Sequence, residues 1–223
     1  MTVTEARSDV QIQHDVLKEL RWDSRVDETD VGVEVDDAIV TLTGTVRTYA
    51  ARLAAQEAAH RVKGVLDVVN DIEVKPIGSR TDTDIAADVR LALERDVFVP
   101  SERIRTTVSH GLVTLEGEVD MYRELADAEA AIRNIDGVIG ILNKLTIRKR
   151  AVSPGEIRQA IESALERQAE REAERIEVIV HDGDVTLEGQ VRSWREKRAI
   201  LGTVGHAPGV RSVIDHLEIA PYV

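Results

Sequence analysis

The sequence predicts an α+β protein made of three tandem copies of one α-β-β-α-β unit, each with a small mixed sheet of three strands. The first observation is a Val-Thr-Leu-x-Gly-x-Val segment that occurs three times, at residues 40–46, 113–119 and 185–191. The second is a Gly-Val pair that follows the glycine of each segment at the same distance, beginning at Gly64, Gly137 and Gly209. The third is an apolar stripe with helical spacing near the start of each copy. Repeats of this kind decide the fold before any single element does.

The composition suits a soluble globular protein and excludes several kinds of site. The 223 residues are 43% hydrophobic and 31% charged, with a net charge of −12 and no Cys. A chain without Cys has no disulfides, Cys-ligated zinc, iron–sulfur cluster or thiol nucleophile. Its acidity disfavours nucleic acid as a partner, because phosphate binding needs concentrated Lys and Arg. With one Phe, two Trp and three Tyr, several small aliphatic cores are expected in place of one large core.

An amphipathic helix is expected to open each unit. Its start is marked by a polar pair three residues apart: Ser8 with Gln11, Thr81 with Asp84, and Ser153 with Glu156. The first and third pairs are capping boxes, in which each side chain bonds the other residue's backbone amide. Apolar residues then recur every fourth position, which gives one buried stripe. They are Ile12, Val16 and Leu20, then Ile85, Val89 and Leu93, then Ile157, Ile161 and Leu165.

A β-hairpin is expected next. Alternating apolar residues at 31–35 and 176–180 indicate a strand with one buried face. A tight turn is expected at Asp36-Asp37 in the first unit, and at the matching His110-Gly111 and Asp182-Gly183. The Val-Thr-Leu segment then returns as the antiparallel partner strand.

A second helix and a last strand complete the unit. The helix carries a stripe formed by Ala55, Ala59 and Val62, by Ala128, Ile132 and Ile135, and by Ile200, Val204 and Ala207. Gly64, Gly137 and Gly209 suit the left-handed position that closes such a helix. The last strand covers residues 68–74 and its copies. A β-α-β connection crosses over right-handed, so this strand should lie parallel to the Val-Thr-Leu strand.

The repeated pattern resembles the BON domain, and the resemblance covers residues 7–220 as three domains, at 7–76, 80–148 and 152–220. It implies two helices packed on one side of each small mixed sheet. It further implies non-enzymatic modules that bind phospholipid or membrane surfaces and serve in osmotic and envelope stress, and one relative couples the module to potassium. Exported members carry a signal peptide. This N-terminus has neither the basic nor the apolar region of such a peptide, so a cytoplasmic location is expected.

The repeat glycines and the polar residues of the last strand favour structural roles. Gly44, Gly117 and Gly189 follow Thr-Leu-x, and no phosphate-loop or dinucleotide spacing surrounds them. We interpret them as bulge or close-packing positions, with a ligand-approach role as the alternative. Asn70, Asn143 and Asp215 occupy one repeated place in the last strand. Local hydrogen bonds to backbone are the favoured use of these side chains, and ligand contact is the alternative.

An aromatic residue recurs at the start of the second helix, as Tyr49, Tyr122 and Trp194. Each lies about 120° from the core stripe of its own helix, at 100° per residue. An aromatic there either packs against a neighbouring copy or anchors in a lipid interface, and packing is favoured.

The strongest basic cluster surrounds the aromatic of the third copy and consists of Arg192, Trp194, Arg195, Lys197 and Arg198. Because helix N-termini favour anions, the cluster is a candidate site for a phosphate headgroup, with an ordinary solvated face as the alternative. The net charge repels anionic membranes, so any such attraction must be local. No His arrangement typical of a metal site or of catalysis is present, and we expect no cofactor and no enzyme.

The sequence therefore predicts a non-catalytic binding or scaffolding protein that interacts with phospholipid or membrane-associated partners in stress physiology. The alternative is a cytosolic potassium or small-ligand sensor whose modules become more compact on binding. The arrangement of the three copies does not follow from their sequence.

Overall fold

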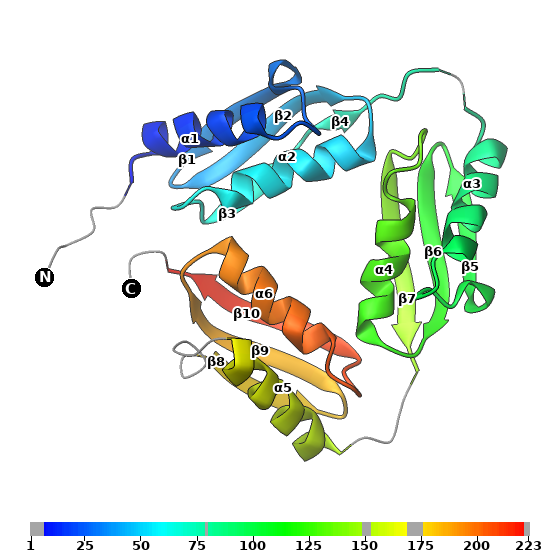
Figure 1. The fold of residues 1–223 in the computed structure, drawn as a ribbon. Helices are drawn as coiled ribbons and strands as arrows, with labels where there is room; N and C mark the ends of the chain where they lie inside the picture. The colour runs from blue at the N-terminus through cyan, green and yellow to red at the C-terminus, as the bar shows by residue number, and fades with distance from the viewer. Residues whose placement is uncertain (1–6, 79, 149–152, 169–175, 221–223) are drawn as a thin grey trace, which may run out of the picture.

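The computed structural model describes residues 7–78, 80–148, 153–168 and 176–220, which form three separate α+β units (Figure 1). Parts of both linkers between the units, at residue 79 and residues 149–152, lie outside the described residues. The first unit contains α1 (Asp9–Trp22), β1 (Val31–Asp36), β2 (Ile39–Val46), α2 (Tyr49–Arg61), β3 (Asp67–Asn70) and β4 (Glu73–Val74). The second contains α3 (Asp82–Arg95), β5 (Ile104–Ser109), β6 (Leu112–Val119), α4 (Tyr122–Ile132) and β7 (Gly140–Ile147). The third contains α5 (Pro154–Gln168), β8 (Ile176–His181), β9 (Asp184–Val191), α6 (Trp194–Gly205) and β10 (Ser212–Ile219).

Each sheet has the predicted mixed topology, which confirms the fold class. The Val-Thr-Leu strand is central, antiparallel to the strand before it and parallel to the strand after it. In the first unit the last strand is divided into β3 and β4, and both pair with β2. The Asp71 N–H between them donates to the Leu42 carbonyl at 2.8 Å, so the chain stays beside β2 through the interruption.

The first helices begin as the sequence predicts, with one addition. Ser8 and Gln11 form the expected capping box, and so do Ser153 and Glu156. Thr81 and Asp84 form one as well, because the shorter carboxylate still reaches the Thr81 N–H at 3.1 Å. All three helices therefore begin at equivalent positions of the repeat.

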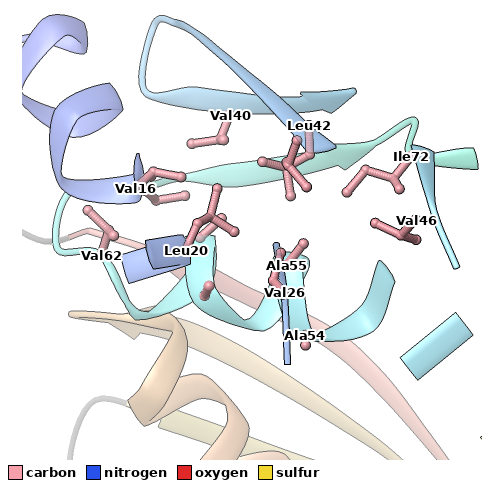
Figure 2. Packing of buried hydrophobic residues seen from close by; sticks show 14 of the residues in the cluster. Val16, Leu20, Val26, Val40, Leu42, Val46, Ala54, Ala55, Val62 and Ile72 are labelled. Carbon is pink, nitrogen blue, oxygen red and sulfur yellow. The ribbon is translucent and has the colours of Figure 1, made fainter. Parts of the chain in front are cut away.

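Each unit has its own aliphatic core between the helices and one face of the sheet. In the first unit α1 contributes Val16 and Leu20, β2 contributes Val40 and Leu42, and α2 contributes a row of alanines (Figure 2). The side chains of Val40 and Leu42 are fully buried, while Thr41 between them points to the other face. The small alanine side chains let α2 lie close to the sheet, which explains how a core almost without aromatics is filled.

The hairpin turns use left-handed backbone. His110 and Gly111 have φ of 51° and 77°, as a two-residue turn of this type requires. The expected first turn, Asp36-Asp37, is wrong by one residue. Asp36 still pairs with Ile39 as the last residue of β1, so Asp37 and Ala38 form the turn, with φ of 48° and 62°.

The repeat glycines that the sequence singles out all have positive φ. Gly44 and Gly117 lie in the central strands at φ 122° and 144°. A Cβ on either would lie 2.1 Å from a backbone oxygen, of Asp30 or Arg103, so only glycine fits there. The remaining glycines that the sequence singles out also have φ between 88° and 141°: Gly64, Gly137, Gly189 and Gly209.

The second helices α2, α4 and α6 lie on the sides of their units that face the other two units (Figure 1). Helix α6 contacts both α2 and α4. The third unit therefore touches the second, to which a linker joins it, and also the first, from which it is far apart in sequence.

Candidate functional site

The basic cluster forms the start of α6. Ser193 caps the helix, and its hydroxyl accepts from the Glu196 N–H at 3.3 Å. The Arg192 N–H donates to the Glu196 carboxylate at 2.7 Å, which fixes the chain as it enters the helix. The side chains of Arg192, Arg195 and Arg198 are exposed. Arg192 and Arg195 thus flank the first turn of α6, the positive end of the helix dipole, where an anion is favoured, and Arg198 follows in the next turn.

Lys197 is part of the cluster in sequence but points toward the sheet. Its side chain is only 13% exposed, and its Nζ lies 2.9 Å from the Asp215 carboxylate. The same ammonium group donates to the Leu217 carbonyl at 2.7 Å. Lys197 therefore holds α6 to β10, while the three arginines face the solvent.

Trp194 lies between two units. Its ring stacks on His60 of α2, with centroids 3.9 Å apart and an interplanar angle of 18°. The indole packs against the core of the first unit, and its Nε1 is buried. The ring is therefore used in a contact between copies.

The two tyrosines at the same repeat position make corresponding contacts. Tyr122 of the second unit packs against the core of the third. A Cβ on Gly205 would lie 2.8 Å from its ring, so the glycine lets the ring approach α6 closely. Tyr49 of the first unit packs against the core of the second. Burial raises its phenol pKa, and the nearby Glu129 carboxylate raises it further.

The three aromatic contacts form a closed cycle. The first unit inserts its aromatic into the second, the second into the third, and the third into the first. Every unit both gives one ring and receives one. We call the three residues Tyr49, Tyr122 and Trp194 the interlocking aromatics.

A family model for the BON domain matches residues 8–76, 81–149 and 154–221. The chain belongs to the BON-domain family. A relative, osmotically-inducible protein Y of Escherichia coli (strain K12), is 30% identical over 140 residues. That match covers 60% of this chain and 65% of the relative, so this chain corresponds to about two thirds of that protein.

Two solved structures resemble the BON units only weakly. One is CdsD, a structural protein of the type III secretion system of Chlamydia trachomatis, with 13% identity and a TM-score of 0.28. The match covers 92% of the CdsD chain and 94% of this chain. The other is the PrgH periplasmic domain, with 13% identity, coverage of 99% of that chain and 93% of this one, and a TM-score of 0.23. At these scores neither likeness carries an argument about this chain.

The polar residues of the last BON strands bond to local backbone. The Asn70 amide donates to the Arg52 carbonyl at 3.0 Å, and its oxygen accepts from the Ile72 N–H at 3.3 Å. Asn143 makes the same two bonds in the second unit. In the third unit Asp215 accepts from the Leu217 N–H and pairs with Lys197. These side chains join the last strand to the second helix.

Sequence reasoning missed the residues that receive the interlocking aromatics. His60 and Gly205 occupy equivalent positions near the ends of α2 and α6 in the BON repeat, and each faces an aromatic from another unit. In the sequence these two residues are linked by their equivalent position in the repeat. His60 differs chemically from Gly205, so nothing in residue type identifies the common role.

Other kinds of site find little support in the described part of the chain. Within it no group of three or more His, Cys, Asp or Glu side chains could hold a metal ion. None of the described helices is long and apolar enough to cross a membrane. A shallow pocket in the second BON unit lies beside the His110-Gly111 turn, and the Arg80 guanidinium at its rim pairs with Asp88. Potassium binding stays a prediction.

Proposed function

We propose that this BON-domain protein is a non-catalytic scaffold that binds anionic phospholipid headgroups at the start of α6. The observation that carries the proposal is the exposure of three arginines, Arg192, Arg195 and Arg198, around one helix N-terminus. One guanidinium group can donate two hydrogen bonds to two oxygens of a phosphate. The backbone N–H groups at the start of a helix also favour a negatively charged group.

The place of Trp194 limits how such binding works. Since its indole packs against the first BON unit, the ring is not available as an anchor among acyl chains. Binding then depends on attraction between the arginines and the headgroups, and salt screens such attraction over about 10 Å at 0.1 M. The net charge of −12 opposes the approach of the rest of the molecule. We therefore propose shallow binding that is sensitive to salt.

The physiological setting of the proposal comes from the relative. The name of that relative describes a protein induced by osmotic conditions. We propose that this chain also acts in osmotic or envelope stress, where its three BON units hold a membrane-associated partner or the lipid surface itself.

The test is co-sedimentation of the full chain with vesicles. We expect binding to vesicles that contain phosphatidylglycerol, none to pure phosphatidylcholine, and loss of binding as salt rises. The triple variant Arg192→Gln, Arg195→Gln, Arg198→Gln should lose at least about tenfold in affinity, because each basic residue near an anionic surface contributes about 1 kcal/mol.

A matched control removes three charges elsewhere. Arg90, Arg105 and Arg158 are also exposed, and one lies in each of α3, β5 and α5. Their triple Gln variant has the same net charge and should bind like the parent. Equal loss in both triple variants would show a general charge effect, and unchanged binding by the α6 variant would refute the site.

A further inference from the structure

We propose that the contact between the third and first BON units is an acid-sensitive latch, in which protonation of His60 releases Trp194 and opens the cycle of three units. This inference concerns the contact between units and does not rest on the lipid proposal, although Arg198 takes part in both.

Burial at the latch favours a neutral imidazole. The His60 and Trp194 rings are stacked at 3.9 Å, so each covers one face of the other. The His60 Nε2 and the Trp194 Nε1 are both buried, and neither has a hydrogen-bond partner among the described residues. In the protonated ring both nitrogens are donors, so the buried Nε2 would carry a proton without an acceptor, next to a charge.

The charges around His60 come from three elements. Glu57 on α2 and Asp67 on β3 favour the protonated ring, while Arg198 on α6 disfavours it. Lys197 on α6 adds another cation, with its Nζ 5.3 Å from the centre of the Trp194 ring. Burial is the largest influence, and the His60 pKa falls from 6.5 to about 4.

The direction of the pH effect follows from that lowered pKa. Above pH 6.5 the imidazole is neutral in both the open and the closed protein, so the latch is at full strength. As the pH falls from 6.5 toward 4, the open state takes up the proton more readily than the closed one. A difference of about 2.5 between the two pKa values corresponds to an increase of about 300-fold in the opening equilibrium once the pH is well below 4, and to about half of that at pH 4.

This contact is also the one whose loss opens the molecule. The chain itself joins the first unit to the second and the second to the third, whereas the third returns to the first only through noncovalent contacts. The other contacts respond differently to acid. Tyr122 faces Gly205, which does not titrate. Near Tyr49, burial raises the pKa of Glu129, so a falling pH neutralises that carboxylate and favours the contact.

The experiment uses the full chain with Trp22→Phe, so that Trp194 is the single tryptophan. Trp22 is 88% exposed, and its replacement leaves the latch untouched. Trp194 emission and the radius of gyration from small-angle scattering are followed from pH 7.5 to 4, with circular dichroism to monitor the folded units. We expect a reversible red shift and an increase in radius below pH 6.5, at constant helix content.

His60→Phe in the same background keeps a stacked ring that cannot take up a proton, and it should stay closed across this range. His60→Gln is a second variant that cannot take up a proton. It serves if Phe disturbs the packing, and it should also stay closed across this range. His14→Gln removes an exposed imidazole and should behave like the parent. A parent whose radius and emission do not change down to pH 4 overturns the proposal, and so does a neutral His60 variant that opens with the parent's midpoint.

Discussion

At the scale of single residues, Asp23 shows how one carboxylate joins two helices. It lies at the end of α1 with its side chain 7% exposed. It accepts hydrogen bonds from Arg25 at 2.8 and 2.9 Å and from Arg61 of α2 at 2.9 Å. Arg25 in turn pairs with Glu57 on α2. The hydrogen bonds from Arg25 and Arg61 hold the Asp23 pKa far below its usual value.

We expect Asp23→Asn to lower the free energy of unfolding of the first unit by about 2–3 kcal/mol at pH 7, because it leaves two nearby guanidinium groups without their shared anion. The lowered pKa means that the contribution is present in full above about pH 4, begins to decline below it, and is lost only as the pH falls through the much lower pKa of the folded protein. Urea unfolding at pH 7 and pH 3 checks both statements. Glu34→Gln, on an exposed strand position, should change stability by less than about 0.5 kcal/mol. A gap between the Asn variant and the parent that is no smaller at pH 3 than at pH 7 would contradict this account.

The interlocking aromatics mark the limit of sequence reasoning at this scale. Helical geometry shows that Tyr49, Tyr122 and Trp194 lie off the core stripe of their own helices, so contact outside the unit could be predicted. Which unit receives each ring could not, because periodicity reports burial only within one amphipathic element. The stack on His60 depends on three-dimensional closure, and no spacing in the chain encodes it.

At the scale of elements, an aspartate in the first turn of the first helix fixes the hairpin turn. The Asp9 carboxylate accepts from the Asp37 and Ala38 N–H groups, and Asp82 accepts from His110 and Gly111 at 2.8 and 2.9 Å. Helix start and hairpin are thereby joined in the first two units. The third unit has Pro154 at this place, and Arg211 holds its turn by pairing with Asp182 and Asp184.

Asp82→Ala should therefore lower the melting temperature of the second unit by a few degrees, since two backbone donors in the turn lose their acceptor. These hydrogen bonds lower the Asp82 pKa, so the difference from the parent should shrink as the pH falls below about 3.8. Calorimetry at pH 7 and pH 3 makes the comparison. Thr83→Ala, next to it in the same helical turn and exposed, is the control and should melt with the parent. Equal melting of both variants at pH 7 would refute the role of Asp82.

The elements themselves were largely predictable, because their periods and caps are local. The first helices, the central strands and the parallel return strand follow directly from apolar spacing. Ends were less certain: α2 stops at Arg61, while the apolar stripe continues to Val62 at the helix cap. The first hairpin turn differed by one residue because Asp37-Ala38 lacks the glycine that marks the other two turns.

At the scale of the whole molecule, contacts between units depend on how closely a ring can approach a helix. Gly205 and Gly202 lie three residues apart in α6 and differ in their surroundings. A Cβ on Gly205 would lie 2.8 and 3.2 Å from two ring atoms of Tyr122, whereas one on Gly202 would meet nothing within 4 Å. An alanine at position 205 would therefore push Tyr122 and the second unit away, whereas an alanine at position 202 would only favour the helical backbone.

We expect Gly205→Ala to destabilise the contact between the second and third units by about 1–3 kcal/mol, as overpacking does. Gly202→Ala should instead raise stability by up to about 1 kcal/mol. Amide exchange in α6, with the radius of gyration as a second measurement, distinguishes the two. If both alanines have the same effect, Tyr122 does not depend on the space at Gly205.

The closed cycle of interlocking aromatics also sets the number of units. Each unit gives one ring to the next unit and receives one from the unit before it, so the contacts run in one direction and close after three steps, as head-to-tail interfaces do in a cyclic oligomer. With three units every ring is seated and every face is filled. A pair of units would leave one ring and one face unmatched. The head-to-tail closure that separate subunits reach by assembly is here made within one polypeptide.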